Sequence, residues 1–532
     1  MSKATEMARV SAKGGFHLLW GLVLSTVISA VGTIVIARLL GPDNMGLYAI
    51  ALAAPNLIST FRDWGVTTAM IKYSAEANSE NNVAKIRSVF VSGLAFEIIV
   101  GLALSVLSLA LSQFLAQFLG RPAIVQLIQI ASLFVLTGAL VNTASAAFTG
   151  IEKMHLNSIM LIVQSIVKTA LIIALVAVGL GTLGAVIGFS VGVLFAGLIG
   201  VLLMFVMYRS LPKPTTNALE LMKTIKTMLR YGLPLSIGAI LSGFLTQFNS
   251  TIMAIFVTNN AYIGNYSVAL NFVVLITFFA TPVTTMLFPA FSKLDAQKDK
   301  ETLRNVFQYS VKYAALIVVP VTVLVMALAQ PAIGTIFEDK YVQAPLYLAL
   351  LSVIYLFSAL GSLSTTSIIN GQGYTKYNLK LTLLSVAIGF PLSFVLISQF
   401  GIIGLIVAST TFSLPGFFLS LRFIKKNFGV TVDWVSSAKI TISSAAAGLL
   451  TYFVISILPF SNPIKLIAGV VVFVVAFLVF AVVTQTLNKA DLVNIREVAN
   501  AMGPLRKPLV VVINLVEKLM NSFKKEKSLS VE

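Results

Sequence analysis

Long apolar runs alternate with short polar segments along almost the whole chain. About fourteen of these runs reach the roughly 20 residues that an α-helix needs to cross a bilayer. Their uniform hydrophobicity predicts helices, because a membrane-spanning β-strand would alternate apolar and polar positions. The predicted spans are residues 14–40, 46–71, 86–114, 122–149, 157–179, 183–208, 229–257, 263–290, 305–330, 343–369, 377–399, 403–424, 437–458 and 464–487.

Composition supports this pattern. The 532 residues are 58% hydrophobic and only 11% charged, whereas a soluble protein is about 25% charged. A chain with so few charges cannot cover the surface of several soluble domains, and with no cysteine it cannot be a disulfide scaffold. The fold class predicted is therefore an all-α polytopic membrane protein.

The net charge of +18 is explained by topology and not by nucleic-acid binding. Most of the Lys and Arg residues fall in alternate loops, and the other set of loops carries only Arg121, Lys340 and Lys465. Cytoplasmic loops are enriched in Lys and Arg. The distribution therefore predicts a multi-pass membrane protein with both termini in the cytoplasm.

An internal repeat divides the predicted spans. Gly46 and Tyr48 match Gly264 and Tyr266 at one constant spacing, each pair lying six spans apart. Two six-helix lobes in the same orientation are typical of transporters that bind substrate between halves and rock to alternate access; a duplicated scaffold or a channel would show the same repeat. The predicted domains are an N-terminal lobe (1–228), a C-terminal lobe (229–430), two additional spans (431–488) and a basic amphipathic tail (489–532).

Five charged residues of the predicted spans are candidates for a functional role, all in the first lobe: Arg38, Arg62, Asp63, Glu97 and Lys168. Charge inside a membrane is costly and commonly functional. At 1.5 Å per residue, Arg62, Glu97 and Lys168 reach similar depths near the midplane. They form either a buried network, with Arg62 paired to Glu97, or a cationic cavity suited to a phosphate or pyrophosphate. Asp63 is either a surface group or a helix cap where the second span breaks at Trp64–Gly65.

The predicted second lobe carries uncharged polar groups within its spans, namely Gln247, Asn249, Tyr266 and Asn271. The chain has no Walker A sequence, and its only histidines, His17 and His155, cannot build a metal site. No outside loop is long enough for a catalytic domain. We therefore expect no enzymatic activity, no cofactor and no metal.

Three segments resemble the polysaccharide-biosynthesis flippases of the multidrug/oligosaccharidyl-lipid/polysaccharide exporter superfamily. The first is IARLLGPDNMGLY (residues 36–48), which is followed by GVTTAMIKY (residues 65–73). The loops FTGIEKMHLNS (residues 148–158) and IINGQGYTKYN (residues 368–378) are similar to that family's loops after spans 4 and 10. The resemblance covers nearly the whole chain.

The resemblance implies that the protein moves an isoprenoid-(pyro)phosphate-linked oligosaccharide across the plasma membrane, among membrane lipids and with glycosyltransferases or polymerases of the same pathway as partners. In that case Arg38, Arg62 and Lys168 would bind the phosphate, and Glu97 or Asp63 would couple an ion or pair with these bases. The sugar would contact the uncharged polar residues of the second lobe: Gln247, Asn249, Tyr266 and Asn271.

Three alternatives remain open from the sequence. A cation-coupled multidrug exporter of the same superfamily would need acidic residues within its spans, and Glu97 is such a residue. A membrane glycosyltransferase would need catalytic groups in a large loop. A membrane scaffold would recruit envelope enzymes through its basic tail.

Overall fold

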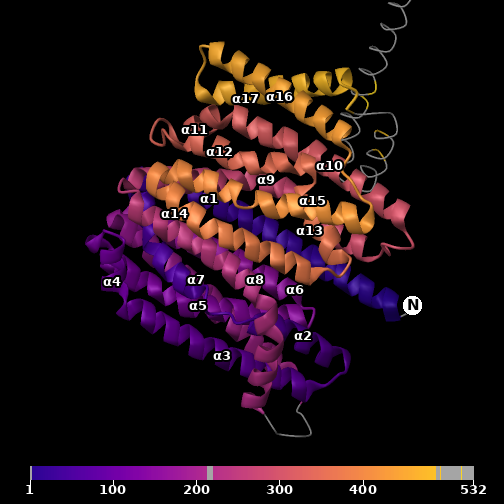
Figure 1. Ribbon diagram of the computed structural model, residues 1–532. Helices are drawn as coiled ribbons and strands as arrows, with labels where there is room; N and C mark the ends of the chain where they lie inside the picture. Colours follow the sequence, from indigo (N-terminus) through magenta and orange to yellow (C-terminus); the bar gives the residue numbers. More distant parts are fainter. Residues whose placement is uncertain are drawn as a thin grey trace, which may run out of the picture. The chain divides into compact units, whose positions relative to one another are not determined.

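The computed structural model describes residues 3–212 and 220–486 together with Leu492, Arg496, Asn514 and Glu517, and its side chains are described from Trp20 onward except at positions 282, 285 and 286. Throughout these ranges the chain is helical and has no strand (Figure 1). The predicted all-α class is therefore confirmed. The predicted tail helix in residues 489–532 lies outside the described residues, apart from four single positions.

The chain forms two compact units, one of Met1–Asn271 and Thr382–Ser409, the other of Phe272–Leu381 and Thr410–Glu532. The helices up to the start of the second unit are α1 (Lys3–Ser59), α2 (Val66–Ser79), α3 (Val83–Ala110), α4 (Ser112–Phe118), η1 (Pro122–Ile124), α5 (Val125–Gly150), α6 (Met154–Leu175), η2 (Val176–Leu180), α7 (Gly181–Ser210), α8 (Leu221–Phe256) and α9 (Asn260–Ser292). Those that follow are α10 (Lys300–Ala327), α11 (Ala329–Phe337), α12 (Ala344–Leu356), η3 (Phe357–Leu360), α13 (Ser362–Gly371), α14 (Thr375–Thr411), α15 (Leu414–Phe428), α16 (Trp434–Ile457) and α17 (Asn462–Val483). The division into six-helix lobes at residues 228 and 430 stays a prediction.

Ten helices of the described chain are long and apolar enough to cross a membrane, or 11 if the bent pair Ala344–Leu360 and Ser362–Gly371 is one span. Three of the ten are too long for a single crossing, namely Trp20–Ser59, Met154–Ser210 and Thr375–Phe428. Each of these three overlaps two of the predicted spans. The predicted count of fourteen crossings stays a prediction.

Glycines in the left-handed region break two of these long helices into pieces. Gly41, within α1, has φ 71°, and Gly401, within α14, has φ 56°. Only glycine adopts such angles without a steric cost. At the first break Pro42 follows directly, and it cannot donate a backbone hydrogen bond. The ribbon that continues through each break is therefore two helices in series.

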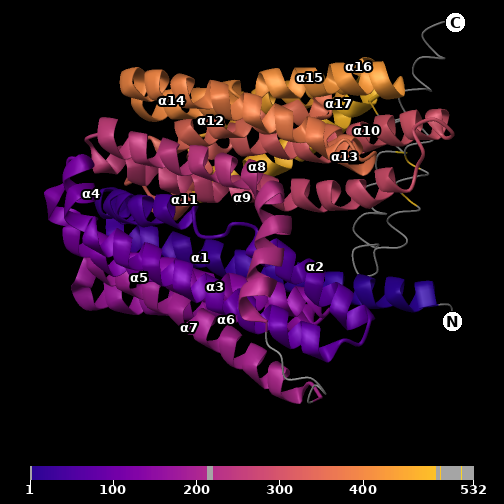
Figure 2. The same cartoon turned by 60° about the horizontal axis from the view of Figure 1, so that its bottom comes forward.

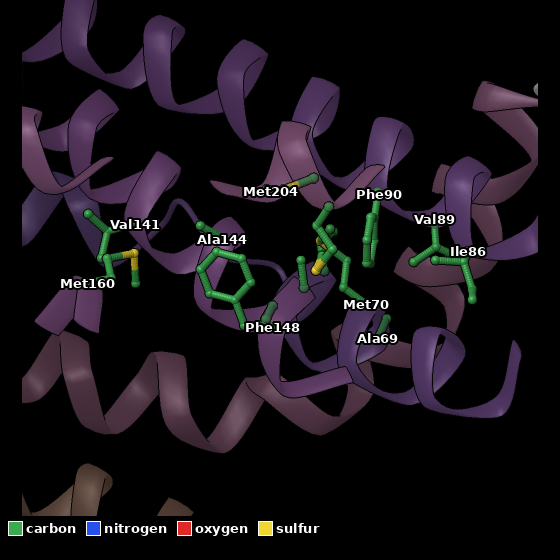
Figure 3. Packing of buried hydrophobic residues seen from close by; sticks show 14 of the residues in the cluster. Ala69, Met70, Ile86, Val89, Phe90, Val141, Ala144, Phe148, Met160 and Met204 are labelled. Carbon is green, nitrogen blue, oxygen red and sulfur yellow. The ribbon is translucent and has the colours of Figure 1, made fainter. Parts of the chain in front are cut away.

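A methionine-rich core holds the helices of the first half together (Figure 3). Met70 on α2, Phe90 on α3, Phe148 on α5 and Met160 on α6 are all fully buried. Unbranched methionine side chains fill irregular gaps between helices. Met228, near the start of α8, belongs to the same cluster, so the first turns of α8 are packed onto the first half.

The first turns of α8 run steeply to the rest of that helix in both views (Figure 2). Pro234 lies inside α8. Proline removes an intrahelical hydrogen bond and clashes with the preceding turn, which accounts for kinks in helices. The segment of α8 before Pro234 therefore runs in a different direction from the rest of α8.

In the second unit, α16 and α17 lie side by side next to α10 and α11 (Figure 1). Gly448 on α16 meets Val323 of α10, and Gly469 on α17 meets Leu328. Small residues at such crossings allow close helix packing in a membrane. The two helices that the sequence places after the repeat are thus packed onto that unit.

Candidate functional site

The second predicted span is interrupted by a turn, as the sequence predicts. Helix α1 ends at Ser59 and α2 begins at Val66. A carboxylate oxygen of Asp63 accepts hydrogen bonds from the backbone N–H of Gly65 at 2.9 Å and of Thr67 at 3.4 Å, and its other oxygen accepts one from the Thr67 hydroxyl. Gly65 has φ 82°. Asp63 therefore satisfies N–H groups at the start of α2, which is the capping role and not the surface role of the two that the sequence left open.

The neighbouring residue, Arg62, points into the first half of the protein. Its Nε lies 3.5 Å from Oε2 of Glu97 on α3, and its Nη1 donates a 3.1 Å hydrogen bond to the carbonyl of Val135 on α5. Gly138 leaves room for the guanidinium, because a Cβ there would lie 2.8 Å from Nη1. The structure thus brings Arg62 and Glu97 together, as one of the two sequence interpretations proposes.

The Arg62–Glu97 pair is buried and incompletely satisfied. Arg62 is 7% exposed and Glu97 is 0% exposed. Among the described residues, neither carboxylate oxygen of Glu97 has a hydrogen-bond partner, and the Nε of Arg62 has none. Unsatisfied buried polar groups are rare in native proteins. The pair therefore consists of two buried charges that attract one another but have few other partners.

Lys168 occupies a different environment on α6. Its Nζ lies 6.0 Å from the centre of the Phe189 ring on α7, and its side chain is half-buried. The backbone of α6 approaches α7 closely here, since a Cβ on Gly192 would lie 2.7 Å from the Cβ of Lys168. Within the part of the chain that the structure describes, Lys168 forms no ion pair. It is a cation in the middle of a span without a carboxylate partner there.

The remaining predicted site residues lie apart from this pair along the chain. Arg38 is exposed, one turn before the break at Gly41. On α8, Gln247 is half-buried, whereas Asn249 is 7% exposed and its Oδ1 has no hydrogen-bond partner in the described chain. On α9, Tyr266 is half-buried, and Nδ2 of Asn271 donates to the carbonyl of Ser267 at 2.7 Å. The roles of these residues stay predictions.

Sequence reasoning did not single out Arg121, which lies between α4 and η1. Its Nε donates to Oδ1 of Asn260 at 2.8 Å, and its Nη2 donates to the carbonyls of Val257 at 2.6 Å and Thr258 at 3.2 Å. Its Nη1 donates to the carbonyls of Ala254 and Leu119. Arg121 is one of only three basic residues in the predicted outside loops, and this rarity could have marked it as a candidate. The sequence does not reveal which groups it would bind.

In the described ranges, no three His, Cys, Asp or Glu side chains come close enough to hold a metal ion. The groups that the structure brings together are suited to binding and charge pairing.

A family model for "Polysaccharide biosynthesis protein" matches residues 35–346, which is more than half of the chain. The chain belongs to the polysaccharide biosynthesis protein family. The predicted resemblance is therefore confirmed at the level of the family. Two similar proteins are named as flippases and not as enzymes: the probable low-salt glycan biosynthesis flippase Agl15 of Haloferax volcanii, 22% identical over 247 residues (46% of this chain and 50% of the relative), and the lipid II flippase MurJ.

Similar proteins come from both archaea and bacteria. Membrane protein MJ1068 of Methanocaldococcus jannaschii is 24% identical over 402 residues, covering 73% of this chain and 78% of the relative. The lipopolysaccharide biosynthesis protein WzxC of Escherichia coli is 22% identical over 351 residues, covering 64% and 67%. Among solved structures, the lipid II flippase MurJ in an inward closed conformation superposes with a TM-score of 0.69 at 15% identity, covering 88% of this chain and 98% of MurJ. The fold of this multi-pass membrane protein is therefore of the MurJ type.

Proposed function

We propose that the protein is a flippase that carries a lipid-linked oligosaccharide, joined through an isoprenoid phosphate or pyrophosphate, from the cytoplasmic to the outer leaflet of the plasma membrane. The sugar and phosphate cannot cross hydrocarbon unaided, because each polar group would lose its partners in water. Two lobes that alternately open to either side would shield the headgroup. The lipid tail would remain in the bilayer, and both termini would lie in the cytoplasm.

The observation that carries the proposal is Lys168, a half-buried cation in the middle of a span with no ion-pair partner in the described chain. An unpaired ammonium within the membrane is costly and is retained where it meets a ligand. Phosphate oxygens are strong acceptors for such a group. In this proposal Lys168 makes the first contact with the phosphate. Arg62 makes a second contact only by leaving Glu97, and Arg38 attracts the headgroup near the break at Gly41, the predicted outer end of the first span.

The polar residues on α8 and α9 suit the sugar part of the substrate. Asn249 is buried with its Oδ1 unpaired in the described chain, so it offers an acceptor for a sugar hydroxyl. Gln247, Tyr266 and Asn271 add further donors and acceptors. Glycosyltransferases that make the substrate and polymerases that consume it are the expected partners in the same pathway.

The test is a flipping assay in liposomes with a fluorescent lipid-linked oligosaccharide and a membrane-impermeant quencher. We expect Lys168→Ala to lose most of the flipping, Lys168→Arg to retain much of it, and Lys153→Ala to behave like the native protein. Lys153 is the matched control, because it lies exposed just before the same helix. Circular dichroism and thermal unfolding would establish that each variant is folded.

Two outcomes would contradict the proposal. Native rates in Lys168→Ala would remove its phosphate-binding role. Export of a cationic dye without movement of the lipid, in the same liposomes, would favour the multidrug exporter. That alternative has one structural feature in its favour, since Glu97 is fully buried with both oxygens lacking hydrogen bonds in the described chain.

A further inference from the structure

Two glycine–glycine contacts join the helices of the first half to the first two helices of the second half, all within one compact unit. In the first contact, a Cβ added to Gly46 would overlap the carbonyl of Asn260, and one added to Gly264 would overlap the carbonyl of Pro42. In each case the obstacle is backbone and not a flexible side chain. These backbones approach so closely that neither position accepts even alanine without separation of the two segments.

The second contact has the same construction at a different place. A Cβ on Gly65, in the turn before α2, would overlap the carbonyl of Gly232 on α8, and a Cβ on Gly232 would overlap the carbonyl of Gly65. Gly65 also needs its left-handed φ of 82°. Both contacts are therefore closed at the same time in this structure.

The two contacts lie at opposite ends of the spans that carry them. Gly46 and Gly264 stand at the start of the predicted second and eighth spans, whereas Gly232 stands at the start of the seventh and Gly65 stands late in the second. Because successive spans cross the membrane in opposite directions, the first contact belongs to the predicted outer end and the second to the predicted cytoplasmic end.

Polar and aromatic contacts reinforce each end. At the outer end, Arg121 reaches from the loop after α4 to the junction of α8 and α9. There it binds Ala254 in the last turn of α8, Val257 and Thr258 in the loop, and Asn260 at the start of α9. The Arg121 guanidinium thus holds the C-terminal end of α8 next to the helices of the first half. Replacing Arg121 would remove a hydrogen bond from each of the carbonyls of Ala254, Val257 and Thr258.

At the cytoplasmic end, the Lys72 ammonium on α2 lies 4.0 Å from the centre of the Tyr231 ring on α8. The Tyr73 ring meets the Tyr231 ring edge-on at 5.7 Å. Cation–π and edge-to-face contacts of this kind contribute about 0.5–1.5 kcal/mol each. They lie next to Gly232 and stabilise the same junction.

We propose that these two junctions are the seals of the transport pathway: an outer seal of Gly46, Gly264 and Arg121, and a cytoplasmic seal of Gly65, Gly232 and the Lys72–Tyr231 contact. The close backbone contact in each seal excludes water and a bulky sugar, and the contacts of Arg121 and of Lys72 with Tyr231 hold it closed. Each seal opens while the other stays closed. The inference rests on the proposed alternating access and names the residues that perform it.

The test uses spin-label distances in the protein reconstituted in lipid. The chain has no cysteine, so labels attach only where cysteine is introduced. Asp43 and Asn259, both exposed, report the outer seal; Glu76 and Thr227, also exposed, report the cytoplasmic seal. We expect Gly264→Ala to shift the outer pair to longer distances with the cytoplasmic pair unchanged, and Gly232→Ala to do the reverse.

A matched control is Gly188→Ala, since a Cβ on Gly188 would lie 2.6 Å from the backbone nitrogen of Ile172, but this crossing joins α6 to α7 inside the first half. It should lower stability without moving either label pair. Where an alanine at a seal prevents folding, Arg121→Ala and Tyr231→Ala take its place as smaller perturbations, with the same expected shifts at the outer and cytoplasmic pairs respectively.

The proposal is overturned if the seal variants fold and leave both distances as in the native protein, or if Gly188→Ala opens a seal. The distances are measured without substrate, so they are independent of what is transported. Selective opening of the seals together with a failure to move any lipid-linked oligosaccharide would reject the proposed substrate and keep the seals. Flipping that persists with both seals unresponsive would reject the seals and keep the function.

Discussion

The buried pair of Arg62 and Glu97 allows a sharp prediction about stability. Removing either partner alone leaves one uncompensated charge inside the first half of the protein, whereas removing both leaves none. We expect Glu97→Leu and Arg62→Leu to destabilise the fold strongly. The double variant should recover most of that loss, because two apolar side chains replace two poorly satisfied ions.

The magnitude follows from the geometry. At 3.5 Å and an effective dielectric constant of about 20, the attraction amounts to about 5 kcal/mol. Burial of each ion costs several kcal/mol, and the Glu97 oxygens have no hydrogen bond in the described chain that would offset this cost. The net contribution of the intact pair is therefore small. Loss of one partner is expected to cost about 3–5 kcal/mol, and the double variant should lie within about 2 kcal/mol of the native protein.

The assay is reversible unfolding of the four proteins of the double-mutant cycle in mixed micelles, with flipping measured on the same preparations. The reasoning is refuted if the single variants are as stable as the native protein, or if the double variant loses as much as the two singles added together. Flipping supplies separate information. A stable but inactive double variant would assign Arg62 a role in transport beyond pairing with Glu97.

Two further predictions concern single positions. Asp433 caps α16 by accepting from Ser436 N–H at 3.2 Å and Oγ at 2.5 Å, so Asp433→Ala should lower the free energy of unfolding by about 1 kcal/mol. Burial raises the pKa of Asp433, but the hydrogen bonds from Ser436 and Val435 and the charge of Lys312 outweigh it and hold that pKa below its usual range. The contribution of Asp433 to the free energy of unfolding should therefore be fully present above pH about 4 and lost as the pH falls through the lowered pKa. Comparing the unfolding of the native protein with that of Asp433→Ala between pH 2 and 7 would measure this loss. Gly138→Ala should place a methyl group 2.8 Å from the Arg62 guanidinium. We expect it to destabilise the protein by about 1–3 kcal/mol, which is less than the expected effect of losing Glu97. An unchanged unfolding midpoint would contradict the packing of Arg62 against Gly138.

The class of fold could be predicted from the sequence because a lipid environment admits few structures. Apolar runs of span length must be helical, and the interruption at Trp64–Gly65 follows from a capping Asp63 beside a glycine. The joining of two spans into one continuous ribbon at Gly41 could not be predicted. Whether the two spans join depends on the backbone angles of Gly41, which either reverse the chain direction or let the second helix continue from the first. The pattern of hydrophobic residues does not determine these angles.

The candidate site was predicted less completely, since side-chain direction depends on neighbouring helices. The sequence places Arg62, Glu97 and Lys168 at similar depths but leaves a network and a cavity equally open. The structure directs Arg62 toward Glu97 and Val135 and leaves Lys168 beside Phe189. The Arg62 side chain can take this direction because Gly138 on α5 has no side chain to block it. The sequence contains no pattern that relates Gly138 to Arg62, so this contact could not be predicted.

Gly46 and Gly264 show how one signal supports two conclusions. In the sequence they mark equivalent positions of a repeat, and repeat markers need not touch. In the structure each meets the backbone preceding the other, at Asn260 and Pro42. A contact between equivalent positions of two repeats is what a pseudo-twofold axis produces where it passes between them. The same substitution at either glycine should therefore disturb one junction, so that combining Gly46→Ala with Gly264→Ala should have less than the additive effect of the two single variants on the outer distance, because the first methyl group already separates the backbones that the second would meet.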